Sequence, residues 1–280
     1  MIDLDQVTFA YPKSSCETLR NLHLRVGAGS ISGLFGPNGS GKSTLLKVIA
    51  GLLFPQGGNC SVLDRVPSGR CPEFLSNIIL LPEDVFVPNL SADSYINQFA
   101  PFYPKFDIGV MEKLLREFNL QAHSKLTELS LGQKKKFLLS FSIATNARLL
   151  LLDEPSNGLD IPSKVQLRNV LLDHYDENRT YIISTHQAHD LEGLIDSVIF
   201  LMDGKILLNR SLDFIGTKIR CGREYEQPND VLYCEPTMDG YAVVDRNSTG
   251  EESNINLELL FNFVVTSAPQ VNSLLGESVI

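Results

Sequence analysis

Gly36-Pro37-Asn38-Gly39-Ser40-Gly41-Lys42-Ser43 decides the fold of this chain, because it has the complete G-x-x-x-x-G-K-[ST] spacing of a phosphate-binding loop. Residues 30–35 (SISGLF) before it have the pattern of a buried strand, and residues 44–52 (TLLKVIAGL) after it carry apolar residues at helical spacing. A strand, a glycine-rich loop and a helix in this order are what phosphate binding requires. The alternative is a glycine-rich turn that matches the motif by chance.

The residue types of this loop indicate its chemistry. Glycines let backbone N–H groups curl around β- and γ-phosphates, and the N-terminus of the next helix adds partial positive charge. Lys42 can reach the same phosphates, and the Ser43 hydroxyl can coordinate Mg²⁺. The residues expected to contact a nucleoside triphosphate here are Gly36, Pro37, Asn38, Gly39, Ser40, Gly41, Lys42, Ser43 and Thr44.

A second signal is the run 149–154, LLLLDE, in which four leucines end in two carboxylates. The pattern predicts a buried strand with Asp153 at its C-terminal end, and ligands of an open α/β sheet bind at that edge. Asp153 is therefore expected to hold Mg²⁺ opposite Ser43, and Glu154 to accept a proton from the water that attacks the γ-phosphate. The alternative is a solvated strand end that carries two acids.

Composition limits the class of protein. The chain has 280 residues, 43% hydrophobic and 20% charged, which predicts a globular protein with one large domain, or one large and one small. The net charge of −9 comes without a basic stripe, so we expect no nucleic-acid partner. The lysine run 134–136 is expected to be the solvated face of a helix.

Cysteine usage and hydropathy indicate the compartment. The cysteines Cys16, Cys60, Cys71, Cys221 and Cys234 are scattered, odd in number and without C-x-x-C spacing. This usage favours reduced thiols in a cytosolic protein over disulfides or a zinc site. The acidic, strand-like N-terminus is not typical of a signal peptide, and no run approaches the roughly 18 apolar residues of a membrane helix.

Alternating strand and helix patterns organise the chain. Strand patterns at 19–26, 77–81, 149–152, 180–184 and 197–201 alternate with helical ones, which predicts a largely parallel sheet covered on both faces. Helical patterns between Pro82 and Leu149 indicate a subdomain attached to that sheet. After about Arg210 we expect a small α+β module, with two strands joined through an Asp239-Gly240 turn and then a helix or apolar strand over 256–265.

A third signal is the segment 129–133, LSLGQ, at the start of a helical pattern. Ser130 and Gln133 have the S-x-x-Q spacing of a capping box, so a purely structural interpretation is available. The position of the segment shortly before the 149–154 strand favours a functional interpretation.

These motifs together resemble the nucleotide-binding subunit of ATP-binding-cassette (ABC) transporters, over about residues 1–210. The resemblance includes the loop 36–43, the LSLGQ segment, LLLLDE, a D-loop-like 156–160 (SNGLD) and His186 in Ser-Thr-His. It implies the ABC-type P-loop fold: an α/β protein with a parallel core sheet, an antiparallel β subdomain and a helical subdomain. We expect the ABC domain over 1–212, its helical subdomain over about 85–146, and a small accessory domain over 213–280.

The resemblance also implies a mechanism. In that family two subunits pack head to tail and enclose two ATP molecules, each held by the phosphate loop of one subunit and the LSGGQ-like segment of the other. Ser130, Gly132 and Gln133 would then contact ATP across the interface, and Asp160 would connect the two sites. His186 would contact the γ-phosphate and hold the water and Glu154 in register. His189 is expected to be a surface residue.

Two positions leave alternatives open, and a third departs from the family pattern. Tyr11 matches the aromatic residue that stacks on adenine, or it is an aromatic that packs at a strand end. Glu83 stands where the family has the Q-loop glutamine; it would ligate Mg²⁺ with altered coupling, or it is an ordinary loop acid. Leu131 replaces a glycine, and we expect its side chain to restrict the backbone and to affect ATP closure more than ATP binding.

The expected function is an ATPase subunit that binds ATP and Mg²⁺ and powers a membrane transporter. The short chain with a single cassette is most similar to bacterial export-type subunits, so the expected transporter is an exporter. The expected partners of the chain are a second ABC ATPase subunit, identical or different, and separate transmembrane permease subunits. Its expected location is the cytoplasm, peripheral at the inner face of the cell membrane. The alternatives are a non-transport ABC ATPase that acts on ribosomes or DNA, and an ATP-sensing regulatory protein.

Overall fold

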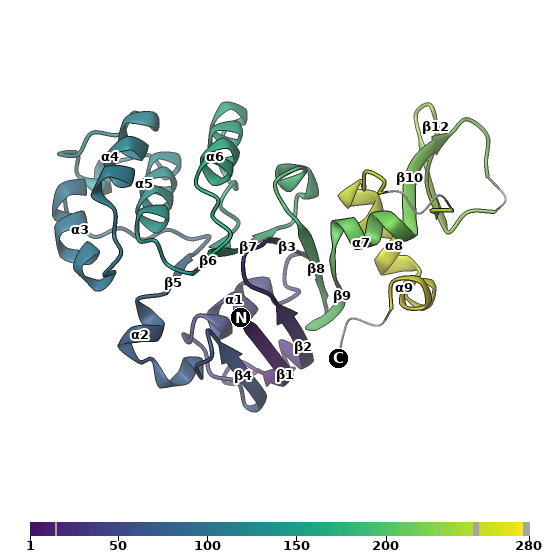
Figure 1. Ribbon diagram of the computed structural model, residues 1–280, viewed down its shortest axis with the longest axis horizontal. Helices are drawn as coiled ribbons and strands as arrows, with labels where there is room; N and C mark the ends of the chain where they lie inside the picture. The colour runs from purple at the N-terminus through teal and green to yellow at the C-terminus, as the bar shows by residue number, and fades with distance from the viewer. Residues whose placement is uncertain (15, 229, 249–251, 277–280) are drawn as a thin grey trace.

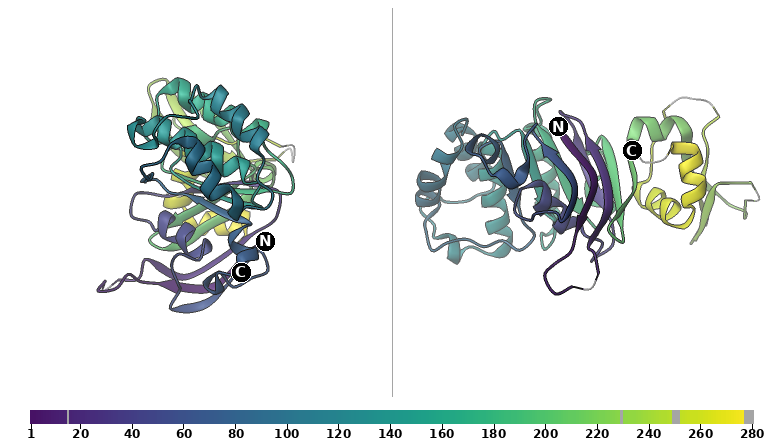
Figure 2. Two further views of the ribbon diagram at one scale, coloured as in Figure 1. Left: turned by 90° about the vertical axis from the view of Figure 1, so that its left-hand side faces the viewer. Right: turned by 90° about the horizontal axis from the view of Figure 1, so that it is seen from below.

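The computed structural model describes residues 1–14, 16–228, 230–248 and 252–276. Two sheets occupy the middle of the molecule, a block of helices lies at one end, and the C-terminal segment lies at the other (Figure 1). The right-hand view of Figure 2, from below, shows the same succession of parts. The sheets therefore form the base from which the other parts extend.

The first sheet is antiparallel and has the strand order β2-β1-β4. Its strands are β1 (Ile2–Phe9), β2 (Leu19–Val26) and β4 (Gly57–Val62). The predicted strand at 19–26 is thus confirmed. Alternate residues of β1 and β2 are buried, so each strand turns one apolar face inward and one face toward solvent.

The central sheet has the order β5-β6-β7-β3-β8-β9 and is parallel except for β9, which pairs antiparallel with β8. Its strands are β3 (Ile31–Phe35), β5 (Ile78–Leu81), β6 (Leu149–Asp153), β7 (Thr180–Thr185), β8 (Ser197–Met202) and β9 (Lys205–Ser211). The predicted parallel sheet is confirmed. Because β3, β6 and β7 are neighbours or next neighbours, the residues that follow them meet at one edge of the sheet.

Four of the six α-helices described in the nucleotide-binding part begin at a serine or an aspartate. The six are α1 (Lys42–Ile49), α2 (Pro72–Leu75), α3 (Ala92–Phe99), α4 (Ile108–Glu117), α5 (Leu131–Ala144) and α6 (Ile161–Asp173). Short 3₁₀ turns are η1 (Pro67–Gly69), η2 (Ala100–Phe102), η3 (Leu126–Glu128) and η4 (Ala188–Leu191). Side chains of Ser91, Asp107, Ser130 and Asp160 accept hydrogen bonds from the first turns of α3, α4, α5 and α6, as N-caps do.

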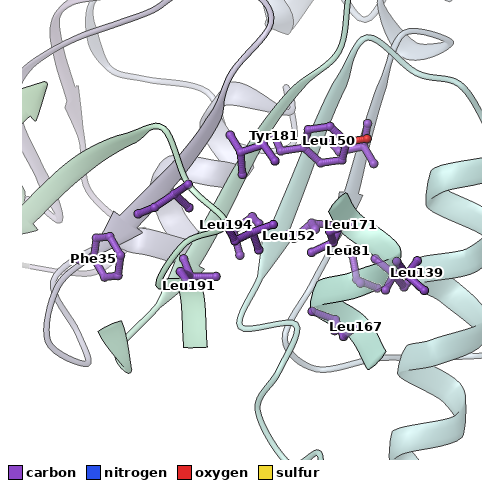
Figure 3. Packing of buried hydrophobic residues seen from close by; sticks show 14 of the residues in the cluster. Phe35, Leu81, Leu139, Leu150, Leu152, Leu167, Leu171, Tyr181, Leu191 and Leu194 are labelled. Atoms are coloured by element: carbon purple, nitrogen blue, oxygen red, sulfur yellow. The ribbon is translucent and has the colours of Figure 1, made fainter. Parts of the chain in front are cut away.

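Two apolar clusters cover the two faces of the central sheet. Leu150 and Leu152 of β6 belong to one cluster, and Leu149 and Leu151 belong to the other, as the alternation of side chains along a strand requires. Figure 3 shows the first cluster, in which Leu139 of α5 and Leu171 of α6 lie beside Leu152 and Leu81. This packing fixes α5 and α6 against the sheet.

The C-terminal segment continues from β9. It comprises α7 (Leu212–Lys218), β10 (Ile219–Glu224), β11 (Tyr233–Thr237), β12 (Gly240–Arg246), α8 (Leu257–Thr266) and α9 (Ala268–Leu275). The two strands predicted around Asp239-Gly240 are confirmed as the antiparallel pair β11–β12, and the segment predicted over 256–265 forms helix α8 rather than a strand, with Asn256 as its N-cap. The ring of Phe261 packs edge-on against Phe200 of β8, with centroids 5.3 Å apart. The division at residue 212 stays a prediction.

Within the described parts of the chain, no helix has the length and apolar character that spanning a membrane requires.

Candidate active site

The phosphate-loop sequence connects β3 to α1 at the C-terminal edge of the central sheet. Gly36 is required by close packing, since an added Cβ would lie 2.1 Å from the Leu201 carbonyl oxygen. Gly41 has φ +108° and its Cβ would lie 3.1 Å from Thr18 O, so a larger residue would strain the loop. The glycines therefore let the loop pass close to its neighbours.

Helix α1 differs from α3–α6 at its start. Among the described residues, no side chain caps the helix at Gly41. The first N–H groups of a helix have no partner within the helix, and together with the helix dipole they favour an anion. This end of α1 is therefore available to a phosphate group.

A cavity of about 460 Å³ lies over this helix end. It is lined by Tyr11, Thr18, Asn38, Gly39, Gly41, Lys42, Ser43, Thr44, Glu83 and Glu154. The connections after β1, β3, β5 and β6 and the start of α1 therefore line one cavity, as was expected for most of these residues. Thr18 was not expected; it lies at the end of the loop between β1 and β2, which carries no motif.

Lys42 is buried and folds back over the loop. Its Nζ donates hydrogen bonds to the carbonyl oxygens of Gly36 at 2.8 Å and Pro37 at 3.4 Å, and it lies 3.8 Å from Glu154 Oε1. The hydroxyl of Ser40 is also buried, and it has no hydrogen-bond partner in the described part of the chain. The loop thus holds a cation and an unpaired hydroxyl, which is the donor set of a site for an anionic ligand.

Asp153 and Glu154 lie at the C-terminal end of β6, where the sequence analysis placed them. Ser184 of β7 donates a hydrogen bond from its hydroxyl to Asp153 Oδ1 at 2.5 Å. The Glu154 N–H donates to Ser184 O and Oγ, each at 3.1 Å. Ser184 therefore orients both acids, a role that sequence reasoning missed although Ser184 directly precedes Thr185-His186.

His186 and Glu154 come together as expected. Nδ1 of His186 lies 2.9 Å from Glu154 Oε1, and Gln187 Nε2 lies 3.3 Å from His186 Nε2. Glu154 is only 4% exposed. His189, by contrast, is exposed on the surface, where its Nδ1 lies 3.2 Å from Glu192 Oε2. The first pair joins a buried carboxylate to an imidazole, an arrangement suited to handling a proton.

Tyr11 has contacts that fit both of its interpretations. Its ring packs edge-on against Phe9 with centroids 5.0 Å apart, as an aromatic at a strand end does. Its hydroxyl lies 3.1 Å from Thr44 Oγ1, and the residue lines the cavity. The ring is therefore at the rim of the site and attached to α1.

Glu83 lies in the cavity wall, after β5. Its Oε1 accepts a hydrogen bond of 2.8 Å from Asn157 Nδ2. Asn157 belongs to the D-loop-like segment, so this bond joins two loops that are far apart in sequence. No motif in the sequence signals this pairing.

Ser130 and Gln133 form a complete capping box at the start of α5. The Ser130 N–H donates to Gln133 Oε1 at 2.9 Å, and the Gln133 N–H donates to Ser130 Oγ at 3.2 Å. Both residues are exposed, and among the described residues that line the cavity none comes from 129–133. Gly132 lies beside Leu159, which an added Cβ would approach to 3.3 Å. The segment is thus separate from the phosphate loop of its own chain.

Leu131 is the first residue of α5 and has no positive φ. The conformation of Leu131 therefore does not require glycine, and the expected effect of its side chain on ATP closure stays a prediction. Its side chain points toward the D-loop-like segment, since a Cβ at Gly158 would lie 3.6 Å from Leu131 Cδ2.

The interpretation of 134–136 as a solvated helix face is wrong for Lys135. This side chain is buried, and its Nζ donates to the carbonyl oxygens of Glu154 at 3.0 Å and Asn157 at 2.8 Å. Lys136 Nζ donates to Gln166 Oε1 at 3.1 Å. Helix α5 packs against the sheet over this turn, and a charge run in sequence does not show which lysine faces inward.

Asp160 lies outside the cavity as the N-cap of α6. Its carboxylate accepts a hydrogen bond from the Ser163 N–H at 3.0 Å. Hydrogen bonds from the Ser163 side chain and backbone lower the pKa of Asp160. Within this chain the residue therefore has a structural role at the start of α6.

The donors near Ser43 and Asp153 fit a magnesium ion that arrives with phosphate. Within the described ranges, no cluster of three or more His, Cys, Asp or Glu side chains forms a metal cage. Mg²⁺ typically takes one or two protein ligands plus phosphate oxygens and water. One hydroxyl and one carboxylate match that requirement; Asp153 accepts a hydrogen bond from Ser184, and Glu83 accepts one from Asn157.

The chain is similar in sequence to ATP-binding proteins of transporters. The family profile described as ABC transporter matches residues 19–157. The chain is 31% identical over 215 residues to the ABC transporter ATP-binding protein YtrB of Bacillus subtilis, with 76% of this chain and 73% of YtrB covered. It is 32% identical over 207 residues to the fluoroquinolones export ATP-binding protein MT2762 of Mycobacterium tuberculosis, with 72% of this chain and 67% of MT2762 covered.

The fold has matching relatives among solved structures. The ATP-binding subunit of an ABC transporter superposes with a TM-score of 0.69 at 25% identity, covering 77% of this chain and 91% of that chain. The expected fold class is thereby confirmed.

Proposed function

This chain belongs to the ABC transporter family, and from that membership we propose that it is the ATP-hydrolysing subunit of an exporter, acting at the inner face of the cell membrane. The observation that carries the proposal is the convergence of the uncapped end of α1, Lys42 and Glu154 on one cavity, with His186 paired to Glu154 behind it. Relatives named for export of fluoroquinolones support the direction of transport.

The proposed reaction begins with the phosphates on the loop. The N–H groups at the start of α1 and the Lys42 ammonium bind the β- and γ-phosphates. On this binding Lys42 exchanges its hydrogen bonds to Gly36 and Pro37 for phosphate oxygens. Ser43 and Asp153 would hold Mg²⁺, which neutralises phosphate charge.

Hydrolysis then uses the buried pair. A water oxygen attacks the γ-phosphorus, the bond to the β–γ bridging oxygen breaks, and Glu154 accepts the proton that the water loses. His186, 2.9 Å from the carboxylate, holds Glu154 and the water in register. The products are ADP and inorganic phosphate.

We propose that a second subunit completes each site. Ser130 and the start of α5 are exposed and apart from the cavity of their own chain, which supports a role toward another chain's nucleotide. A helix N-terminus with a serine cap can bind the γ-phosphate from the opposite side. ATP would then close the dimer, and hydrolysis would open it.

A groove beside the site is the proposed contact with the permease. A cavity of about 580 Å³ lies between the end of α1, α2, β5 and η2. Its wall is largely apolar, with Phe102 69% exposed and Leu52 50% exposed. Exposed apolar surface of this kind is typical of a binding site for another protein. β5 leads from this groove directly to Glu83, so a movement of the permease would reach the active site.

The test is ATP turnover with and without the partner membrane protein. We expect the purified chain to hydrolyse ATP, and co-expressed permease to co-purify with it and to change its rate. Phe102→Asp should abolish the association, whereas Tyr225→Asp, at an exposed aromatic in the C-terminal segment, should not. Equal loss in both variants would contradict the groove, and absence of turnover in the wild type would contradict the proposed function.

A further inference from the structure

Lys135 is a buried cation in the helix that begins with the LSLGQ segment. It is 4% exposed, although Lys134 and Lys136 on either side of it are half-buried. Its Nζ donates one hydrogen bond to the carbonyl oxygen of Glu154 and one to that of Asn157. The side chain therefore joins α5 directly to the backbone of the loop that follows β6 and begins with Glu154.

Several carboxylates lie around Lys135, but among the described residues none forms a direct ion pair with it. Burial lowers the pKa of its amine, whereas the nearby charges of Glu83, Glu154, Asp153 and Asp84 raise it. An ammonium group removed from water is costly unless its protons are hydrogen-bonded and its charge is compensated. Two carbonyl oxygens and the surrounding carboxylates supply both conditions.

The two contacted carbonyls lie at the turn that aims Glu154. Glu154 has φ +46°, an uncommon backbone conformation for a residue other than glycine. Ser184 holds its N–H side and Lys135 holds its carbonyl side, so the peptide is fixed from both directions. A conformation of this kind persists only where its neighbours determine it.

The second contact extends the connection to Glu83. Lys135 holds the carbonyl of Asn157, and the side-chain amide of Asn157 donates to Glu83 Oε1. Helix α5, the loop 154–160 and the segment after β5 are thereby joined through one lysine and one asparagine.

We propose that Lys135 is a positioning residue that transmits the state of α5 to Glu154 of the same chain. In the proposed dimer the start of α5 binds the ATP of the opposite site, whereas Glu154 serves the ATP of its own site. Through Lys135, the orientation of Glu154, the base of one site, therefore depends on whether ATP occupies the other site. The inference rests on the proposed function, because it concerns the turnover of that site.

The experiment compares Lys135→Met, which removes the donors, and Lys135→Gln, which keeps N–H donors without charge, with the matched control Lys134→Met. For each variant kcat and KM for MgATP, equilibrium ATP affinity and the thermal unfolding midpoint are measured. We expect Lys135→Met to lower kcat by about a hundredfold, the usual effect of misplacing a reacting group, while ATP affinity stays within about threefold. The kcat of Lys135→Gln should lie between that of Lys135→Met and that of the wild type.

A purely structural role gives a different pattern. If kcat and ATP affinity fall together with the unfolding midpoint, or if kcat of Lys135→Met matches that of Lys134→Met, the inference is wrong. If Lys135→Met does not fold, Lys135→Gln decides, and a kcat equal to that of Lys134→Met contradicts the inference. Failure of the proposed function is distinguishable, because the wild type and Lys134→Met would then also lack turnover.

Discussion

Glu154→Gln tests the assignment of the general base. Oε1 of Glu154 lies 2.9 Å from His186 Nδ1 and 3.8 Å from Lys42 Nζ, and the side chain is buried. Glutamine keeps the shape of the side chain but cannot accept the proton of the attacking water. General-base catalysis contributes about 10²–10⁴ in rate, which corresponds to about 3–5 kcal/mol in the activation free energy. We expect kcat to fall by that factor.

Binding should respond in the opposite way. The charge of Glu154 competes with phosphate for Lys42, so its removal should leave ATP affinity unchanged or raise it. The ATP-bound variant should therefore accumulate as a dimer. Single-turnover release of phosphate measures the first effect, and size-exclusion chromatography with and without MgATP measures the second.

Glu192→Gln is the matched control. Glu192 also pairs with a histidine, His189, but on the surface, and we expect its kcat to stay within about twofold of the wild type. A Glu154→Gln protein that keeps more than about a tenth of wild-type kcat would refute the role of general base. A variant that stays monomeric in MgATP would count against the two-subunit site.

Three further expectations concern the same region and the thiols. Lys42→Ala should weaken ATP binding by at least about tenfold, measured by equilibrium dialysis, because a charge-assisted contact to phosphate is lost, whereas Lys47→Ala in the last turn of α1 should bind normally. Glu83→Gln keeps an oxygen that can accept a hydrogen bond from Asn157, so the basal rate of ATP hydrolysis should stay within about threefold of the wild type, while its stimulation by the permease changes. Equal effects on the basal and the stimulated rate would contradict a coupling role. Burial raises the pKa of the Cys60 thiol to about 12, so at pH 8 only about one Cys60 thiol in ten thousand is ionised. A thiol-reactive disulfide reagent should therefore modify the exposed Cys16 far faster than Cys60. Comparable modification rates in the Cys16→Ser and Cys60→Ser proteins would disprove this difference.

The order of elements and the type of site were predictable from local patterns. Apolar runs such as 149–152 identify buried strands, because a strand covered on both faces tolerates few polar residues. The glycine-rich loop predicts a phosphate site, because its backbone must bend where side chains do not fit. Both signals are local in sequence, so one chain is enough to read them.

The contacts that aim the chemistry were not predictable. Ser184 reaches Asp153 because β7 pairs with β6 in a register where these two residues are opposite, and no motif records a register. Asn157 reaches Glu83 across 74 positions of sequence. Each of these pairs depends on how two elements pack.

Residues 36–43 and 149–154 by themselves predicted a site for a nucleoside triphosphate, because phosphate, metal and proton chemistry each demand particular residue types at particular spacings. The ABC type came from the resemblance that 129–133, 156–160 and His186 add. Only the tertiary structure decided which of three consecutive lysines is buried. Helix α5 rotates about 100° per residue, so the packing of α5 against the sheet turns Lys135 toward the carbonyls of Glu154 and Asn157 and leaves its two neighbours half-buried.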